Sequence, residues 1–464
     1  MYFDKNYPKI YQGIDEKLEN YISREIQSTC IARLKTNLIT AIIGARQVGK
    51  TTLIMKLKEI ISESGIVCKE RIFYYSFDDP MLRAELSLDF KFIEKEIERT
   101  LGRSITKLKK PILLIIDEAQ KLPEIFDWIK MIYDNSNNNL KIILSGSSSP
   151  GIKKKSTESL AGRISFLKLY PFTIRELIQN LTNTSLPKPL WNCLPKKRII
   201  DFLLSRQAIL YKHKSNLDKL LERILIEGSL PGVYTAKSID EKYLRLSSMV
   251  STYLERDIRL SAEIGNLNDY SNLLKILSFE VGSILNLNKL SLDLGIAYNT
   301  VKKYISTLQD TFILNSLPPL FRRVRKRFVK SNKMYFFDVG VANFLSKRTE
   351  KEHIRGKCGF IFENILIKSF ESENENCPLP KAKYFWRDYE GHEIDFVFGN
   401  DFKHIIPVEI YFGRNFPKEK MRNFYTFFRE FKESRYGILI YQGDVKEERV
   451  SGKSVYLIPW WLWL

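Results

Sequence analysis

The sequence predicts an α/β protein whose N-terminal half is built on a doubly wound parallel sheet. Three observations indicate this fold: a glycine-rich loop between a strand and a helix, an apolar run ending in two acids, and strands that alternate with helical segments. At roughly 100–200 residues per domain, the 464 residues allow about two to four domains. The 44% hydrophobic content is typical of packed globular domains.

The glycine-rich loop is the most specific of these features. Residues 38–43 (LITAII) read as a short buried strand, and residues 52–57 have apolar positions at helical spacing. The sequence between them fits GxxxxGK[ST], in which glycines let successive N–H groups face a phosphate at a helix N-terminus. We therefore predict an ATP-binding P-loop composed of Gly44, Ala45, Arg46, Gln47, Val48, Gly49, Lys50, Thr51 and Thr52.

An acidic pair follows a second predicted strand. Residues 111–116 (PILLII) form a continuous apolar run, as in a strand buried on both faces, and Asp117 and Glu118 come next. Ligands of such sheets bind at this carboxyl edge. We expect Thr51 and Asp117 to hold the Mg²⁺ that accompanies ATP, Lys50 to reach the β- and γ-phosphates, and Glu118 to polarise the attacking water.

Two more strands are predicted in the same half. Residues 71–77 (RIFYYSF) precede an acidic turn, and residues 141–144 (KIIL) precede a serine-rich turn. A small polar side chain in that second turn would lie near the γ-phosphate or the attacking water. Ser145 and Ser147 are both candidates, which periodicity does not separate, and a plain Ser/Gly turn is the alternative.

The order of several motifs is more specific than any one of them. They are GARQVGKTTL (44–53), LLIIDEAQ (113–120), ILSGSSS (143–149), SLAGR (159–163), YPFTIREL (170–177), GSLPGVY (228–234) and YLERDI (253–258). Together they resemble AAA+ ATPases of the archaeal and bacterial type that carry a C-terminal PD-(D/E)XK nuclease-like domain. The resemblance implies an ATPase domain with a helical lid over residues 1–260. It also implies that Arg163 lies near the nucleotide, as a finger toward a neighbouring subunit or a sensor in cis; a purely structural arginine is the alternative.

Residues 261–330 are predicted to form a winged helix-turn-helix. A short helix ends at Gly295, and Asn299 is the expected N-cap of a second helix with apolar residues on one face. This second helix takes the recognition position and exposes Thr300, Lys302, Lys303 and Ser306. A basic run suited to DNA phosphates follows, and a protein-interaction module with solvated charges is the alternative: Arg322, Arg323, Arg325, Lys326, Arg327, Lys330 and Lys333.

Residues 331–464 resemble the nuclease-like domain of the same group. A predicted helix carries Glu363, and strands over 393–398 and 405–410 carry Asp395 and Glu409, which the resemblance implies as a second, metal-binding acidic set. The family lysine two residues after the second strand acid is replaced by Tyr411, which cannot supply its positive charge. Lys418 or Lys420 would have to move into the site, so a fold that binds without cutting is favoured.

The net charge of the chain indicates which kinds of binding partner to expect. The net charge of +20, from 74 Lys and Arg against 54 Asp and Glu, favours DNA or an acidic surface. Five scattered cysteines, a polar N-terminus and the lack of 18 consecutive apolar residues predict a cytoplasmic chain without a membrane span. We expect an ATP-driven switch that engages DNA or a protein partner, and a homo-oligomer is one form it could take. The alternatives are an ATP-dependent nuclease and a regulatory interaction protein with slow ATPase turnover.

Overall fold

The computed structural model describes Leu18 and residues 21–136, 139–147, 156, 158–193, 198–253, 266–322, 331–348, 350–354, 356–400, 404–415 and 417–464. It divides the chain into two compact units, residues 1–170 and 171–464. Within the described residues, no helix has the length and apolar character needed to cross a membrane.

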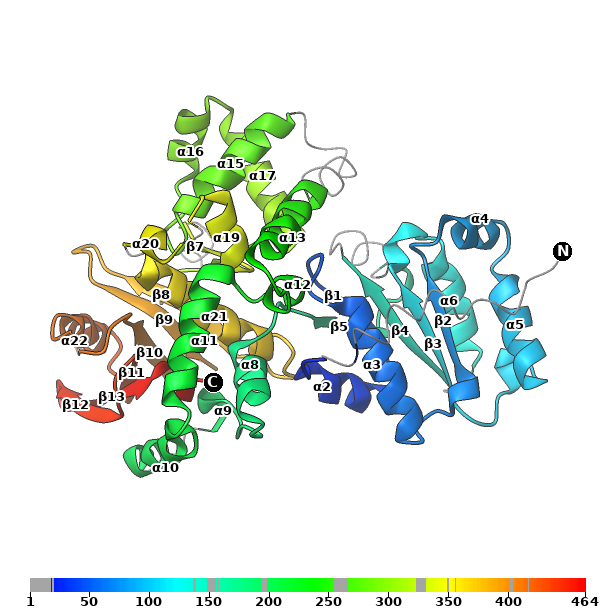
Figure 1. Ribbon diagram of the computed structural model, residues 1–464, viewed down its shortest axis with the longest axis horizontal. Helices are drawn as coiled ribbons and strands as arrows, with labels where there is room; N and C mark the ends of the chain where they lie inside the picture. Colours follow the sequence, from blue (N-terminus) through cyan, green and yellow to red (C-terminus); the bar gives the residue numbers. More distant parts are fainter. Residues whose placement is uncertain are drawn as a thin grey trace. The chain divides into compact units, whose positions relative to one another are not determined.

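The N-terminal unit contains a five-stranded parallel sheet of order β2-β3-β4-β1-β5, which confirms the predicted doubly wound fold (Figure 1). Its strands are β1 (Ile39–Ile43), β2 (Ile72–Ser76), β3 (Ile112–Asp117), β4 (Leu140–Gly146) and β5 (Ile164–Lys168). Strands β1 and β3 are buried along their whole length, as their unbroken apolar sequences require.

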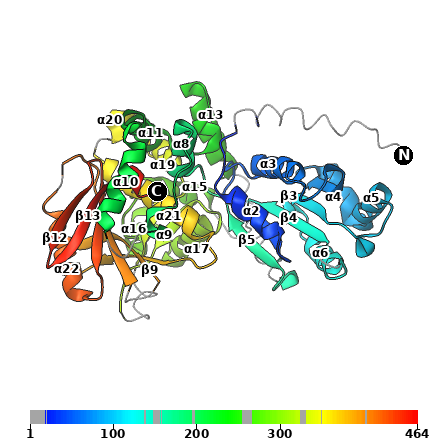
Figure 2. The ribbon, with the colours of Figure 1, turned by 90° about the horizontal axis from the view of Figure 1, so that it is seen from below.

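Helices cover both faces of this sheet, and Figure 2 shows α3 and α6 on opposite faces. The parallel order requires crossover connections between the strands, which these helices supply. The helices are α2 (Ile26–Leu34), α3 (Lys50–Glu63), α4 (Pro80–Leu88), α5 (Lys91–Leu101) and α6 (Ile125–Asp134), with 3₁₀ turns η2 (Lys69–Arg71), η3 (Ile105–Lys107) and η4 (Ala119–Lys121).

The second unit begins with a helical region. Its helices are α8 (Ile174–Thr182), α9 (Leu190–Cys193), α10 (Ile199–Tyr211), α11 (Lys214–Glu227), α12 (Pro231–Tyr234) and α13 (Ile239–Thr252). Helix α11 packs against α19 (Val339–Leu345) and α21 (Cys358–Asn374), both much later in the chain. The helices of the predicted lid, which the sequence assigned to a domain ending at residue 260, therefore lie in the second compact unit.

Three helices follow in the segment predicted to form a winged helix-turn-helix: α15 (Leu267–Phe279), α16 (Leu287–Leu294) and α17 (Tyr298–Asp310). Gly295 ends α16 at φ +65°, a left-handed conformation that glycine adopts without strain. Ala297 rather than Asn299 is the N-cap of α17. Strands β6 (Leu314–Leu317) and β7 (Lys333–Phe336) pair antiparallel, so the expected boundary at residue 330 would cut a sheet in two. Most of the predicted basic run, residues 323–330, lies outside the described residues.

The C-terminal part is a six-stranded mixed sheet of order β12-β13-β11-β10-β9-β8. Its elements, after the short helix α20 (Lys351–Ile354), run α21, β8 (Ala382–Arg387), β9 (Glu393–Gly399), β10 (Ile405–Ile410), α22 (Lys420–Glu430), β11 (Tyr436–Tyr441), β12 (Lys446–Val450), β13 (Lys453–Pro459) and η7 (Trp460–Leu462). Strands β8, β9 and β10 are antiparallel neighbours, whereas β11 runs parallel to β10. Strand β13 is the last strand of the chain and pairs with β11 and β12.

Helices α21 and α22 pack on opposite sides of this sheet (Figure 1). Phe370 of α21 contacts Phe396, Phe398 and Trp463, whereas the phenylalanines of α22 pack with Trp386 and Leu439. The sheet is thus buried on both faces, and Asp395 of β9 and Glu409 of β10 are buried within it.

Candidate functional site

The glycine-rich loop joins β1 to α3 and curls as the motif requires. Gln47 and Gly49 adopt positive φ values of 60° and 91°, which turn successive N–H groups inward. Gly44 lies against β5, since a Cβ there would stand 2.3 Å from the carbonyl oxygen of Leu169. The loop is therefore held between two strands at the carboxyl edge of the sheet.

Lys50, the first residue of α3, lies inside this curl. Its side chain is 6% exposed, and its ammonium donates to the carbonyl oxygens of Gly44 at 3.1 Å and Ala45 at 3.0 Å. The positive charge is thus placed beside the inward-facing amides, where it suits a bound polyphosphate.

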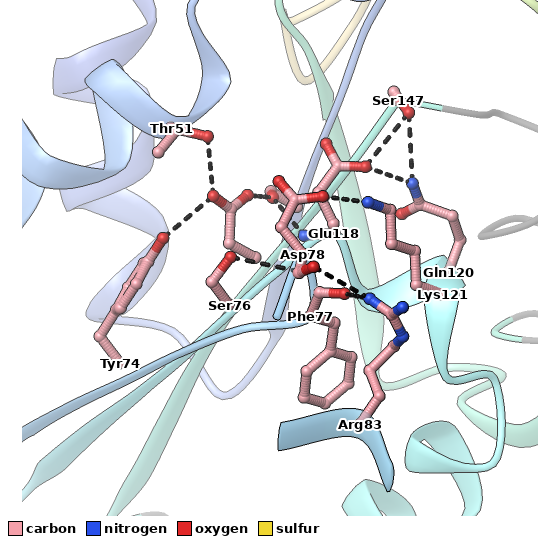
Figure 3. A network of polar contacts seen from close by, with 12 residues as sticks. Thr51, Tyr74, Ser76, Phe77, Asp78, Arg83, Glu118, Gln120, Lys121 and Ser147 are labelled. Atoms are coloured by element: carbon pink, nitrogen blue, oxygen red, sulfur yellow. Dashed lines mark hydrogen bonds and ion pairs between the residues drawn. The ribbon is translucent and has the colours of Figure 1, made fainter. Parts of the chain in front are cut away.

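Asp117, at the end of β3, is held by hydroxyl groups. Thr51 donates to its Oδ2 at 2.7 Å, Tyr74 donates to the same oxygen at 3.1 Å, and Ser145 donates to Oδ1. Figure 3 shows Thr51 and Tyr74 approaching from two different elements. A hydroxyl and a carboxylate in direct contact are oxygen donors of the kind Mg²⁺ prefers, so Thr51 and Asp117 fit the predicted metal.

Glu118 has an unusual backbone conformation, with φ +56°. Strain of this kind is common at functional sites. Its Oε2 accepts hydrogen bonds from Gln120 at 2.6 Å and from Ser147 at 3.3 Å (Figure 3). Ser145 therefore contacts Asp117, whereas Ser147 contacts Glu118, a division that periodicity did not predict.

Three contributors to this site were missed in the sequence. Tyr74 supports Asp117 from β2. Gln120 lies between Glu118 and Ser147, and its buried Oε1 has no hydrogen-bond partner among the described residues. Arg24, 4% exposed, donates to the carbonyl oxygens of Val48 at 3.0 Å and Tyr170 at 2.5 Å. Gln120 could have been found from the sequence, because it lies two residues after the acidic pair. No sequence pattern points to Arg24.

Arg163 lies away from the loop. It directly precedes β5, and its carbonyl accepts from Ile39, the first residue of β1. Gly44 is five residues further along, about 16 Å at roughly 3.3 Å per residue. The guanidinium makes two bonds to Asp134, at 2.6 and 2.9 Å. The register therefore places Arg163 at the end of the strands opposite the nucleotide loop, a position that does not favour the predicted cis-sensor role.

Helix α17 has two accessible faces. Tyr298, Lys302, Ser306 and Gln309 line a groove of about 1170 Å³ whose other wall includes residues 380–384. Lys303 is also exposed, whereas Thr300 is half-buried and not exposed as predicted. The predicted recognition helix thus presents polar side chains toward a groove as well as toward solvent.

The three C-terminal acids lie in one cluster. The β9–β10 register places Asp395 beside Glu409, and Glu363 of α21 joins them through Lys333. Lys333 Nζ lies 3.0 Å from Glu363 Oε1 and 3.9 Å from Asp395 Oδ1. Tyr335 donates to Glu363 Oε1 at 2.5 Å.

A lysine also occupies the place that the sequence left open. Lys420, on α22, contacts Glu409 Oε2 and lies 3.3 Å from Asp395 Oδ2. Asn423, one turn later, donates to the other oxygen of Glu409 at 2.8 Å. Of the two candidates considered, Lys420 thus reaches the acids from a helix, and Lys333 is an additional ammonium that motif spacing did not indicate.

Burial and neighbouring charges shift the pKa values of the acidic and basic groups in this cluster in different directions. Burial raises the pKa of Glu363 to about 7 and that of Glu409 well above its usual range. Burial also acts to raise the pKa of Asp395, but Lys420 and Lys333 outweigh it and lower this pKa. Burial acts to lower the pKa of Lys333, but Glu363, Asp395 and Glu393 hold it above its ordinary value. Both lysines therefore stay charged among the carboxylates.

Three family models match successive parts of the chain. Residues 36–178 match the model of an AAA domain, residues 218–352 a domain of unknown function (DUF8612), and residues 358–463 another domain of unknown function (DUF4143). Uncharacterised proteins of Mycobacterium bovis and Haemophilus influenzae are 23% and 24% identical, over 78% and 75% of this chain and 69% and 76% of theirs.

Solved structures give weaker similarities. A Walker-type ATPase of Pyrococcus abyssi is 16% identical, with a TM-score of 0.44 over 70% of this chain and 96% of its own. The ORC2 protein of Aeropyrum pernix is 16% identical, with a TM-score of 0.35 over 76% and 97%. Because both scores are under 0.5, the assignment rests on the loop geometry and the AAA match. This chain carries an AAA-type P-loop ATPase fold in its N-terminal unit, followed by two domains that sequence families describe without a function.

Proposed function

We propose that the N-terminal unit binds ATP with Mg²⁺ and hydrolyses it. The observation that carries the proposal is the direct contact of Thr51 with Asp117 beside the curled loop that holds Lys50. Thr51 and Asp117 would hold the metal, which when bound neutralises charge on the phosphates. Lys50 and the loop amides would bind the β- and γ-phosphates.

The acid and amide next to this site suit water activation. Glu118 would accept a proton from the attacking water while the oxygen of that water forms a bond to the γ-phosphorus. The bond between the γ-phosphorus and the bridging oxygen breaks at the same time, and ADP leaves with the electron pair of that bond. Ser147 and Gln120 would orient Glu118, and Gln120 Oε1, which has no hydrogen-bond partner in the part of the chain that the structure describes, would accept a hydrogen bond from the same water.

Lys50→Ala tests the site. Without the ammonium, Mg·ATP affinity measured by calorimetry should fall at least about 100-fold, as expected when a charged contact is removed. Lys56→Ala is the control, because Lys56 lies on the same helix and pairs with Glu59 at 2.8 Å. Tight binding retained by Lys50→Ala would reject the proposal.

We further propose that nucleotide state changes how α16 and α17 engage DNA. The exposed Lys302 and Lys303 and the net charge of +20 support this role. Lys302→Ala/Lys303→Ala should weaken duplex binding and reduce the slope of log affinity against log salt by about 2. Lys446→Ala/Arg449→Ala removes equal charge from exposed positions on β12 as the control. An unchanged salt slope would favour a protein partner instead.

A metal-dependent phosphodiesterase is the second candidate, and the placement of Lys420 favours it. The carboxylates Glu363, Asp395 and Glu409 are suitable donors for Mg²⁺, which when bound would polarise a phosphate oxygen. Lys420 would supply the charge that Tyr411 lacks. DNA cleavage with Mn²⁺ should be lost in Asp395→Asn and Lys420→Met but kept in Lys432→Met, which changes an exposed lysine. No cleavage by the wild-type chain leaves a binding role.

The cellular setting and assembly are proposals as well. All five cysteines are free thiols, which supports a reducing cytoplasm. A homo-oligomer would let Arg163 act on a neighbouring subunit's nucleotide, although its own chain holds it at Asp134. Sedimentation with and without ATP tests the oligomer.

A further inference from the structure

The C-terminal acidic cluster is contacted by a lysine that belongs to a different sheet. Lys333 is the first residue of β7, which pairs with β6 of the small two-stranded sheet that follows α17. Its side chain is 3% exposed, and its ammonium lies 3.0 Å from Glu363 and 3.9 Å from Asp395 and contacts Glu393. A fully buried charge is tolerated only with partners of this kind.

The two lysines divide the cluster between them. Lys333 faces Oδ1 of Asp395, whereas Lys420 faces Oδ2 of the same carboxylate and contacts Glu409. Each oxygen of Asp395 therefore faces a different ammonium. Tyr335, two residues after Lys333, donates to the same Glu363 oxygen that Lys333 contacts.

A divalent cation and Lys333 would compete for the same oxygens. Mg²⁺ takes carboxylate ligands at about 2.0–2.1 Å and is sensitive to any second cation beside those ligands. Glu363 and Asp395 are bridged by the ammonium from one side, so a metal bound to both would lie next to it. Lys420 occupies the other side, as a site that neutralises phosphate would require.

We propose that Lys333 is a built-in cation that fills the Glu363–Asp395 half of this site and keeps divalent metal out until β7 moves. The site is thereby coupled to the helix-turn-helix, because β7 is paired with the strand that follows α17. The inference rests on the phosphodiesterase proposal only for the choice of a divalent metal as the competing cation. It does not require that the chain cleaves DNA.

Mn²⁺ binding to the full chain without nucleotide tests it, followed by electron paramagnetic resonance and calorimetry. Wild type and Lys333→Arg, which keeps the charge, should bind Mn²⁺ weakly at this site. Lys333→Met should bind one Mn²⁺ at least about tenfold more tightly, the size of effect that groups next to metal ligands usually have. The gain should vanish in Lys333→Met/Asp395→Asn.

Lys333→Met leaves buried carboxylates unpaired and risks unfolding. Lys333→Met/Glu393→Gln also removes the negative charge of Glu393, which contacts Lys333, and so leaves fewer unpaired carboxylates. It keeps the three predicted metal ligands and therefore replaces Lys333→Met if that variant does not fold. A folded variant with unchanged Mn²⁺ affinity would overturn the proposal, as would tight Asp395-dependent binding by wild type. Tighter Mn²⁺ binding by Lys333→Met without DNA cleavage would support this inference and reject the phosphodiesterase proposal. DNA cleavage by wild type, with no gain in Mn²⁺ affinity in Lys333→Met, would support the phosphodiesterase proposal and reject this inference.

Discussion

The two carboxylate sites of this chain differ in what faces the acids. Asp117 receives hydrogen bonds from the hydroxyls of Thr51, Tyr74 and Ser145, which leave its negative charge uncancelled. Asp395 lies between the ammonium groups of Lys333 and Lys420. Both acids lie on buried strands, but the neighbours of Asp117 are hydroxyl groups whereas those of Asp395 are ammonium groups. Acidic residues alone therefore do not define a metal site; their neighbours decide whether it is available.

The first way to sharpen this comparison is Glu118→Gln. The amide cannot accept a proton from water, so turnover should fall about 100- to 1000-fold, the usual cost of losing such a group. Mg·ATP affinity should stay within about threefold, because the phosphate contacts remain. Phosphate release under single-turnover conditions and calorimetry measure the two quantities, and equal losses in both would contradict the assigned role.

The second prediction concerns a buried acid that makes no contact with either site. Asp338 accepts hydrogen bonds from the amides of Ser229 at 2.7 Å and Val341 at 3.2 Å, and burial raises its pKa to about 6 from 3.8. Because the folded-state pKa is the higher one, its contribution to stability is full below about pH 4 and falls as pH rises to about 6.

Over that window, wild type should lose about 2–3 kcal/mol of unfolding free energy relative to Asp338→Asn, in which nothing titrates at this position. Denaturant unfolding of both proteins at pH 4 and pH 7 makes the comparison. Parallel pH curves would show that Asp338 does not titrate there.

Gly44→Ala tests the packing of the nucleotide loop. The added Cβ would stand 2.3 Å from the carbonyl oxygen of Leu169, so the loop and β5 must separate. Overpacking of this kind typically costs about 1–3 kcal/mol, and thermal unfolding of the variant would show it as a lower midpoint. An unchanged midpoint would mean that β5 does not fix the loop.

The smallest effect is expected for Arg163→Ala. The ion pair with Asp134 is on the surface and at the far edge of the sheet, so ATP turnover of the dilute chain should not change. Turnover that depends on Arg163 only at high protein concentration would reveal a role between subunits. A loss in the dilute chain would contradict the position assigned to it.

The sequence predicted the strands around the N-terminal site well because the signals for these strands are local. The apolar run 111–116 with its terminal acid became β3 (Ile112–Asp117), and residues 38–43 became β1 (Ile39–Ile43) within one residue. Phosphate binding there depends on backbone curvature and a neighbouring helix start, which one short motif specifies.

The C-terminal site was less predictable because its contacts are distant in sequence. Asp395 and Glu409 lie on the neighbouring strands β9 and β10, but Lys333 and Lys420 approach from β7 and α22. Helix α22 carries Lys420 and Asn423 on the side that faces Glu409, a consequence of packing that no spacing rule gives. The division of the chain after Tyr170 was likewise missed, because it depends on how α11 packs against α19 and α21.

The central claim is that the first site accepts a divalent cation and the second is already filled. Counting Mn²⁺ bound to the wild-type chain by electron paramagnetic resonance tests both halves at once. We expect about one Mn²⁺ per chain that requires ATP and is lost in Lys50→Ala. A tightly bound Mn²⁺ that needs no nucleotide and is lost in Asp395→Asn would contradict the account.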